Sequence, residues 1–250
     1  MEFIKVKTRL VNPPKDDISD IYRSLNLSEG DLVVISSKIV AINQGRCVKT
    51  EEKEALIYKE AEKLLATNHH KFFITKKENT IIANAGIDSS NASGYEIMWP
   101  LKPQSEAKKI YDFFKKIHNL KNFGVMIVDS TSAPLRRGVM GTCIGFFGFN
   151  PLRDYVGQND LFGRPMEVSK SNIAESIASF VNLLMGEGDE QTPIVIMKGM
   201  EELVFSEDDF YSDFIIEESE DLYFPILKNL KGDFLFCLAF LQVLSSLGTF

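Results

Sequence analysis

The order of hydrophobic and polar residues predicts alternating strands and helices. Short apolar runs predict strands at residues 1–10, 32–36, 124–128 and 193–199, and the runs 71–76 and 79–86 predict a hairpin. Apolar residues at helical spacing predict helices at residues 16–25, 51–65, 105–117 and 173–185. Because both periods alternate along the chain, we expect an α/β protein with mixed sheets and flanking helices.

Capping residues support two of these helices. Thr50 is a suitable N-cap for the helix at 51–65, whose first turn is acidic, as the helix dipole favours. Asn172 is followed three residues later by Glu175, and Gly186 is a natural stop, so the helix between them is well defined. The glycine-rich stretch 137–163 indicates close backbone approach or positive φ angles. The acidic segment 201–221 is expected to be solvated.

Composition indicates an ordinary globular protein. The chain has 250 residues, of which 44% are hydrophobic and 25% charged, and its net charge of −7 argues against general nucleic-acid binding. The cysteines lack zinc or redox spacing, and the first ten residues lack a signal-peptide core, so we expect the cytoplasm. Residues 234–250 carry no charge, but they are short for a membrane span and contain polar residues. A buried terminal helix or an oligomer contact is favoured over a membrane tail.

Three carboxylates lie on turn-like peptides. Asp88 in NAGID and Asp129 in VDS each follow an apolar run, and Glu187 lies between two glycines in MGEG. A carboxylate beside a buried element is costly unless a cation meets it. Such oxygen ligands suit Mg²⁺ or Mn²⁺, which usually serve the phosphates of a nucleotide. The pattern predicts a metal- and nucleotide-dependent enzyme, although each acid alone also fits a capped loop or turn.

Other polar residues near these acids could complete a site. Ser130 offers a hydroxyl to a metal or phosphate, and Lys38 offers a point charge to a phosphate. Arg136 and Arg137 could neutralise a phosphate or a carboxylate. For the lysine and the arginines, simple surface exposure is the alternative. No Gly-x-x-x-x-Gly-Lys-Ser/Thr loop is present, and the histidines have no ligand spacing.

Six segments occur in one characteristic order. They are GDLVVISSKIVAINQGR (30–46), NAGIDSSNA (84–92), GVMIVDS (124–130), RRGVMGTCIGFFGF (136–149), DLFGR (160–164) and NLLMGEGDEQTP (182–193). In this order the chain resembles the coenzyme F420-0:γ-glutamyl ligase family, and the combination of NAGID with MGEG is specific. KTRLV, DSTSAPLRRG and EGDEQTP make it most similar to the branch described as folate-metabolism γ-glutamate ligases. The resemblance covers most of residues 1–230, taken as a catalytic domain of one or two lobes; 231–250 form an apolar extension.

The resemblance implies a fold, a reaction and a set of site residues. The fold is a two-lobed α/β fold of the family's own, distinct from P-loop and ATP-grasp enzymes, in an intertwined homodimer. The implied reaction joins L-glutamate to an acceptor through an amide bond and consumes GTP or ATP. One metal position matches Asp88 and Asp129, and a second matches Ser130 and Glu187, so two Mg²⁺ or Mn²⁺ ions are expected. The implied nucleotide contacts are Thr8, Arg9, Leu10, Val11, Ser37, Lys38, Asn91, Met185, Gly186, Gly188, Gln191 and Thr192.

Two departures from the family pattern bear on the acceptor. Ile42 replaces a lysine that coenzyme F420 ligases usually carry, and Thr131 to Pro134 replace a Gly-Arg pair. They favour a folate-type acceptor over a deazaflavin one, with Arg136 and Arg137 as partners for the carboxylates of glutamate. Two other possibilities remain: a nucleotide- and metal-binding regulatory protein without catalysis, and a membrane-tethered enzyme that uses residues 234–250.

Overall fold

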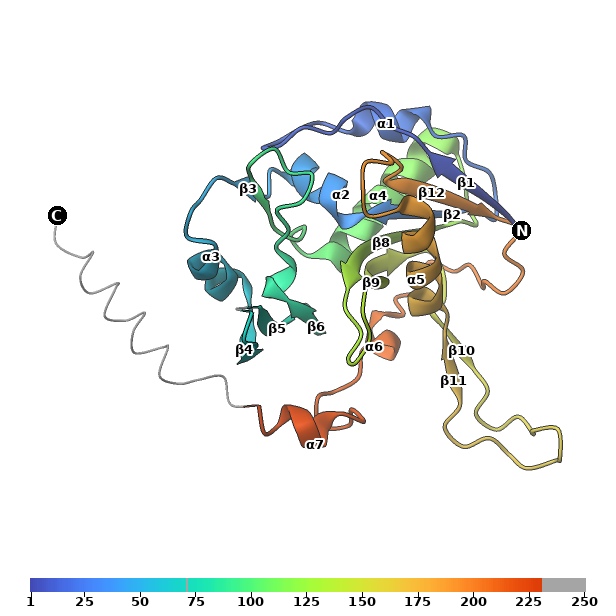
Figure 1. Cartoon of the computed structure of the whole chain (residues 1–250). Coiled ribbons are helices and arrows are strands. Elements are labelled where there is room, and N and C mark those ends of the chain that lie inside the picture. Colours follow the sequence, from blue (N-terminus) through green and yellow to red (C-terminus); the bar gives the residue numbers. More distant parts are fainter. Residues whose placement is uncertain (71, 231–250) are drawn as a thin grey trace. The chain divides into compact units, whose positions relative to one another are not determined.

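The computed structural model describes residues 1–70 and 72–230, and they form a mixed α/β fold as the sequence predicts (Figure 1). The chain divides into two compact units. The large unit comprises residues 1–51 and 86–215, and the small unit comprises residues 52–85 together with the described residues 216–230. The sequence predicts that residues 1–230 form one catalytic domain of one or two lobes, and this assignment stays a prediction.

A five-stranded sheet lies at the centre of the described part of the large unit. Its strand order is β1 (Glu2–Val6), β12 (Ile194–Lys198), β2 (Leu32–Ser36), β8 (Gly124–Thr131) and β9 (Met140–Phe147). Strands β2 and β8 are parallel, and the other neighbours are antiparallel. β2 and β12 are apolar because both faces of these inner strands are covered. The predicted strands at 1–10, 32–36, 124–128 and 193–199 are thereby confirmed, with shorter or longer ends.

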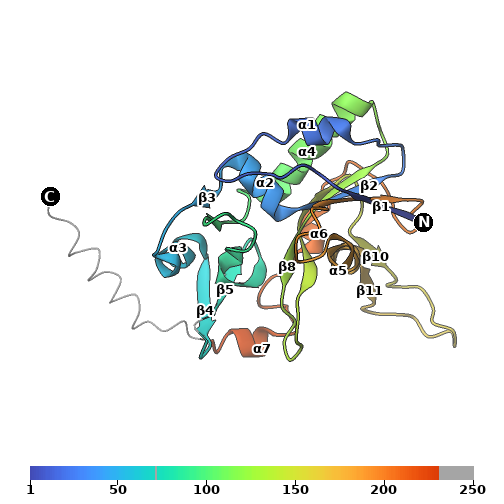
Figure 2. The ribbon, with the colours of Figure 1, turned by 45° about the horizontal axis from the view of Figure 1, so that its top comes forward.

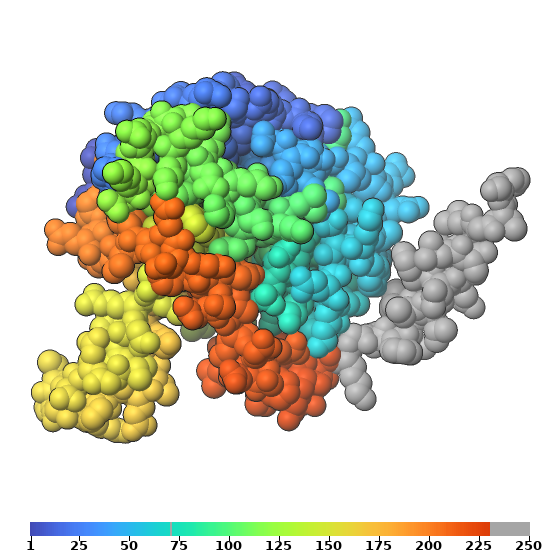
Figure 3. All heavy atoms as spheres, turned by 180° about the vertical axis from the view of Figure 1, so that it is seen from behind, coloured from blue at the N-terminus to red at the C-terminus, as the bar shows by residue number. Residues whose placement is uncertain are grey.

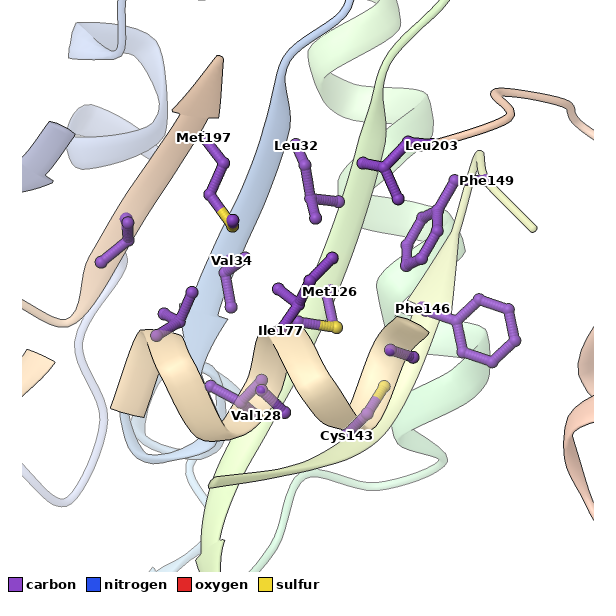
Figure 4. Packing of buried hydrophobic residues seen from close by; sticks show 14 of the residues in the cluster. Leu32, Val34, Met126, Val128, Cys143, Phe146, Phe149, Ile177, Met197 and Leu203 are labelled. Carbon is purple, nitrogen blue, oxygen red and sulfur yellow. The ribbon is translucent and has the colours of Figure 1, made fainter. Parts of the chain in front are cut away.

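Helices cover both faces of this sheet. Helix α5 (Ile173–Met185) packs on one face, and α4 (Pro103–His118) lies on the other with α1 (Ser19–Ser24) and α2 (Ser37–Gln44) (Figure 2). Figure 4 shows Ile177 of α5 above alternate residues of the strands, including Val34, Met126 and Val128. The alternation follows from the two-residue period of a strand, which sends neighbouring side chains to opposite faces. This packing fixes the ends of β2 and β8, where the candidate site lies.

The large unit also carries a projecting arm. Strands β10 (Leu152–Asp154) and β11 (Lys170–Asn172) pair antiparallel, and the chain between them extends away from the central sheet (Figures 1 and 3). A short pair, β3 (Cys47–Val48) with β7 (Glu96–Ile97), connects the region after α2 to the segment before α4. The buried side chains between α5 and the sheet, among them Val34, Met126 and Ile177, form the core cluster, and helix α6 (Tyr211–Phe214) packs against it.

The small unit consists of short elements, and one largely buried charge pair lies among them. Its described elements are α3 (Lys53–Glu60), β4 (Lys63–Thr67), β5 (Phe73–Lys77), β6 (Thr80–Ala83) and α7 (Phe224–Leu227). Strands β5 and β6 form the predicted hairpin, with left-handed Glu78 and Asn79 in the turn. Lys77 pairs with Glu60 at 2.6 Å, and both side chains are largely buried, so neither charge is left without a partner.

Three element predictions were wrong. The helix predicted at 51–65 ends at Glu60, since residues 63–67 pair with β5 as a strand, and its N-cap is Glu52 and not Thr50. Helix α2 was missed because Ser36 to Lys38 were taken for the end of a strand. The acidic segment 201–221 is not simply solvated: Leu203 is buried, and Phe205 and Phe210 pack on the core cluster beside it.

The apolar segment 234–250, for which a terminal helix, an oligomer contact and a membrane tail were considered, lies outside the described residues. Within residues 1–70 and 72–230, no helix combines the length and the apolar character needed to cross a membrane.

Candidate functional site

Asp129 is partly buried in the middle of a hydrogen-bonded network. It pairs with Thr142 inside β8, because the register with β9 continues to Thr131 and not only to Val128 as predicted. Ser37 donates its hydroxyl to Asp129 Oδ1 at 2.7 Å, and the indole N–H of Trp99 donates to Oδ2 at 2.5 Å. Burial raises the pKa of Asp129, the nearby charge of Asp88 adds to the increase, and the hydrogen bonds from Ser37 and Trp99 oppose it.

Asp88 holds a cation in this structure, namely the ammonium group of Lys38. Lys38 Nζ lies 2.7 Å from Asp88 Oδ2 and also donates to the carbonyl and hydroxyl oxygens of Ser90. Ser90 in turn donates its backbone N–H and its hydroxyl to the Asp88 carboxylate. Burial acts to raise the pKa of Asp88, but the hydrogen bonds and charge of Lys38, together with Ser90, outweigh it and lower the pKa.

Ser130 connects the same strand to Glu187. Its hydroxyl donates to Glu187 Oε1 at 2.8 Å, and the side-chain amide of Asn182 donates to the same oxygen at 2.8 Å. Successive strand residues point to opposite faces, so Asp129 turns toward α2 and Trp99 whereas Ser130 turns toward α5. The Asp129–Ser130 dipeptide therefore contacts Ser37 and Trp99 on one side and Glu187 on the other. Asp88 lies close enough for its charge to raise the pKa of Asp129, and its partner Lys38 follows Ser37 in the chain. We call Asp88, Lys38 and Ser90 the Asp88 cluster, and Ser130, Asn182 and Glu187 the Glu187 cluster.

The loop after α5 adopts a compact form that places several predicted nucleotide contacts together. Gly186 has φ +79° and ψ 171°, a backbone conformation that essentially only glycine adopts without strain. Asn91 donates its amide to the carbonyl of Gly188 at 2.8 Å, and Thr192 donates its hydroxyl to the carbonyl of Met185 at 2.9 Å. The backbone N–H of Thr8 donates to the carbonyl of Gln191 at 3.1 Å.

The remaining predicted residues differ in how they relate to this loop. The guanidinium of Arg9 is held by the carboxylates of Asp16 and Asp20, so its side chain braces the N-terminal segment. Leu10 is exposed and Val11 is buried. Arg136 and Arg137 are exposed on the connection between β8 and β9, shortly after Ser130. Their proposed contacts with nucleotide or glutamate stay predictions.

Three residues that contact the acids were missed from the sequence. Trp99 gave no signal beyond its rarity, because it lies 30 residues along the chain from Asp129, the acid that it contacts. Asn182 offered a weak signal, being a polar residue among the apolar residues Phe180 to Met185 at the end of its helix. Ser90 lies within the quoted NAGIDSSNA segment, but only the structure shows both of its groups on Asp88.

The donor atoms fit hard divalent cations, although the three carboxylates do not form one cluster. Within residues 1–70 and 72–230, no three His, Cys, Asp or Glu side chains gather closely enough to hold a metal ion. The clusters instead combine carboxylate oxygens with the Ser130 hydroxyl and the Asn182 amide oxygen, which is a donor set suited to Mg²⁺ or Mn²⁺. The ammonium group on Asp88 shows that this cluster accepts positive charge.

Comparisons with known proteins give one consistent match. The sequence profile of the family described as "F420-0:Gamma-glutamyl ligase" matches residues 53–199. The chain is similar to the coenzyme F420:L-glutamate ligase of Archaeoglobus fulgidus, with 34% identity over 74% of this chain and 82% of that protein. Proteins of the same name from Methanopyrus kandleri and Methanocaldococcus jannaschii are 32% and 30% identical over 75% and 73% of this chain, and 82% and 81% of their own lengths.

Proposed function

This chain belongs to the F420-0:Gamma-glutamyl ligase family, and we propose that it joins L-glutamate to a coenzyme F420-type acceptor with the consumption of GTP or ATP. The observation that carries the proposal is the Asp129–Ser130 dipeptide at one end of β8, which contacts Ser37 on one side and Glu187 on the other. The residue after Ser37, Lys38, pairs with Asp88 and so brings the third acid to the same region. Lys38 and the loop 185–192 contact these acids or their immediate neighbours, which is the arrangement that nucleotide phosphates require.

The proposed reaction has two steps. A carboxylate oxygen of the acceptor attacks the γ-phosphorus of the nucleotide, forming an acyl phosphate and releasing the nucleoside diphosphate. The amine of glutamate then attacks the acyl carbon, a C–N bond forms, and inorganic phosphate leaves with the amine losing a proton. Mg²⁺ or Mn²⁺, held by Asp88, Asp129, Ser130 and Glu187, would supply positive charge that offsets the phosphates. The residues of the chain align the phosphates, with Lys38 and Asn91 beside them.

The acceptor is the point on which the sequence and the comparisons differ. Two departures of the sequence from the family pattern favour a folate-type acceptor, and one of them is Ile42 in place of a lysine. Ile42 is only 2% exposed, so a different residue at this position changes how α2 packs on its neighbours and says little about the acceptor. The relatives reported above are all named for coenzyme F420. We therefore place the deazaflavin acceptor first and the folate-type acceptor second.

The test is a reaction of the purified full chain with Mg²⁺ or Mn²⁺, GTP or ATP, glutamate and either F420-0 or a reduced folate as the acceptor. Mass spectrometry should detect the acceptor with one or more added glutamates, together with nucleoside diphosphate. Asp129→Ala should abolish turnover, whereas Asp112→Ala, a change on the exposed face of α4, should not. Metal-dependent nucleotide binding without turnover on either acceptor would indicate the non-catalytic regulatory alternative.

We also propose that the protein is a homodimer in the cytoplasm. The arm between β10 and β11 carries Leu161 and Phe162, which are 98% and 96% exposed, and Val168, which is 86% exposed. Large apolar side chains gathered on a projecting segment typically mark an interaction site. A second copy of the chain is the partner that the family resemblance implies.

A further inference from the structure

Trp99 is held rigidly beside the candidate site. Its side chain is 1% exposed, and a Cβ on Gly86 would lie 2.2 Å from the indole nitrogen, so only glycine allows the peptide of Gly86 to pack against this ring. The backbone around Trp99 is anchored as well. Arg46 donates to the Trp99 carbonyl at 3.0 Å, and Gln44 accepts from the N–H of Leu101 at 2.7 Å.

We infer that Trp99 is a positioning residue that orients the Asp129 carboxylate toward a divalent cation. This inference rests on the proposed function, since it assigns a role to Trp99 within the same site. Trp99 donates to Oδ2 of Asp129 while Ser37 donates to Oδ1, and the backbone N–H of Ser130 also hydrogen-bonds to this carboxylate. Since an ionised carboxylate has about four lone-pair sites, the three donors fix its orientation and leave room for a cation. Groups that hydrogen-bond to a ligating carboxylate fix its orientation and support metal affinity.

A purely structural role for Trp99 would require only its ring. Any large aromatic side chain could fill the space beside Gly86, but Phe and Tyr cannot place an N–H donor at the indole position. A carboxylate that loses water needs partners, and the Trp99 N–H donates to Oδ2 of Asp129. The two roles therefore differ in their dependence on the N–H group, and this difference can be measured.

The first experiment uses the intrinsic fluorescence of the wild-type protein. The chain contains one tryptophan, so all indole emission comes from Trp99. Adding Mn²⁺, a paramagnetic ion, should quench this emission with the same midpoint as Mn²⁺ binding followed by electron paramagnetic resonance. Mg²⁺ should compete and reverse the quenching. If Mn²⁺ binds without any change in the emission, the inference is wrong.

The second experiment removes the N–H group and keeps the ring. Trp99→Phe should weaken Mn²⁺ binding by about 10- to 100-fold, as loss of such partners typically does, and should raise the metal concentration needed for turnover. Phe114→Leu, a change of a buried aromatic residue on α4, is the matched control and should lower thermal stability without altering Mn²⁺ affinity. Wild-type Mn²⁺ affinity in folded Trp99→Phe would overturn the inference.

Asp129→Asn separates failure of this inference from failure of the proposed function. If Asp129→Asn binds Mn²⁺ as the wild type does, Asp129 is not a ligand, and both the metal site and the role of Trp99 are wrong. If Asp129→Asn loses Mn²⁺ and Trp99→Phe retains it, the metal site stands and only the inference fails. If Trp99→Phe does not fold, the quenching of the wild-type emission and its loss in Asp129→Asn decide the question.

Discussion

At the scale of single residues, the site balances burial against charge. Asp129 and Asp88 both lose water, yet their pKa values move in opposite directions, because Asp129 has only neutral donors whereas Asp88 has the Lys38 ammonium. The ammonium takes part of the space and charge that a divalent cation would take. Lys38 can therefore either stay on Asp88 or turn to a phosphate, and nucleotide and metal would together release it.

Lys38→Met tests this competition. Without nucleotide, we expect Mn²⁺ to bind up to about fivefold more tightly, because the partly exposed pair contributes about 0–1 kcal/mol that the cation no longer has to overcome. With nucleotide present, turnover should fall, because the phosphates lose a positive partner. Mn²⁺ titration with and without GTP measures both effects. Weaker Mn²⁺ binding in the absence of nucleotide would contradict a competition between Lys38 and the cation for Asp88. Lys102→Met, at the N-terminal side of α4, is the control.

Glu175 provides a prediction on pH. Burial raises its pKa, while hydrogen bonds from Thr142 and the N–H of Cys143 oppose the increase. The pKa of Glu175 is higher in the folded state than in the unfolded state, so above the folded-state pKa the ionised carboxylate destabilises the fold. This destabilisation disappears as the pH falls to the pKa of an exposed glutamate. Glu175→Gln should thus raise the melting temperature at pH 7, and the gain should shrink in acid. The exposed change Glu202→Gln should show no such trend; a gain independent of pH would refute the assignment.

The sequence identified much of the candidate site from local signals alone. Asp88, Asp129 and Glu187 stand out because each acid follows an apolar run or lies between glycines. The sequence alone does not show on which face of the sheet each side chain lies. The polar residues Asp129 to Thr131 look like the end of a strand, and only pairing with β9 extends β8 through them. Trp99 was missed because its contact with Asp129 spans 30 residues.

At the scale of elements, two glycines of β9 allow helices to approach the sheet closely. A Cβ on Gly141 would lie 2.1 Å from the carbonyl oxygen of Ala178 on α5, and one on Gly145 would lie 2.5 Å from the carbonyl oxygen of Pro103 on α4. The glycine-rich stretch is thus explained in part by close backbone approach, as expected. Since α5 also carries Asn182, the approach at Gly141 sets the distance between that helix and Ser130.

Gly141→Ala should therefore disturb both stability and the site. We expect a loss of about 1–3 kcal/mol in the free energy of unfolding, because the backbone of α5 must move to admit a methyl group. Turnover should fall as well, since α5 would shift from Ser130. Gly30→Ala is the control for turnover: nothing lies within 4 Å of its added Cβ, so its left-handed backbone, at φ +82°, should lower stability while turnover stays unchanged. Denaturant unfolding and a turnover assay compare the two variants. Wild-type stability and turnover in Gly141→Ala would contradict the packing argument.

Strongly periodic elements could be predicted, and short ones could not. Helix α5 was found with its caps, because Asn172 accepts from the N–H of Glu175 as the capping pattern indicates. The helix predicted at 51–65 fails where β4 begins, because pairing with β5 outweighs the helical propensity of its residues. Helix α2 has mostly buried residues and so lacks the polar stripe that marks an amphipathic helix.

At the scale of the whole molecule, the chain builds its small unit from two separate segments. Residues 52–85 supply α3 and the strands β4 to β6, and the described residues 216–230 return to them. Glu218 pairs with Lys63 and Lys76, which ties the later segment to the earlier one. Such a discontinuous unit gives no local signal in the sequence, because its contacts join positions more than a hundred residues apart.

The projecting arm allows a prediction on assembly. Leu161 and Phe162 lie at its tip next to the Asp160 turn, in which the carboxylate accepts from the N–H groups of Phe162 and Arg164 and so keeps the apolar side chains outward. If this tip packs on a second copy, the double change Leu161→Glu with Phe162→Glu buries two charges without partners and should convert a dimer to a monomer. Light scattering after size-exclusion chromatography measures the mass. Leu222→Glu, at an 83% exposed position outside the arm, should leave the mass unchanged. A monomeric wild type, or a dimer that survives the double change, would remove the arm from the interface, because charges introduced at a buried contact cannot be accommodated without cost.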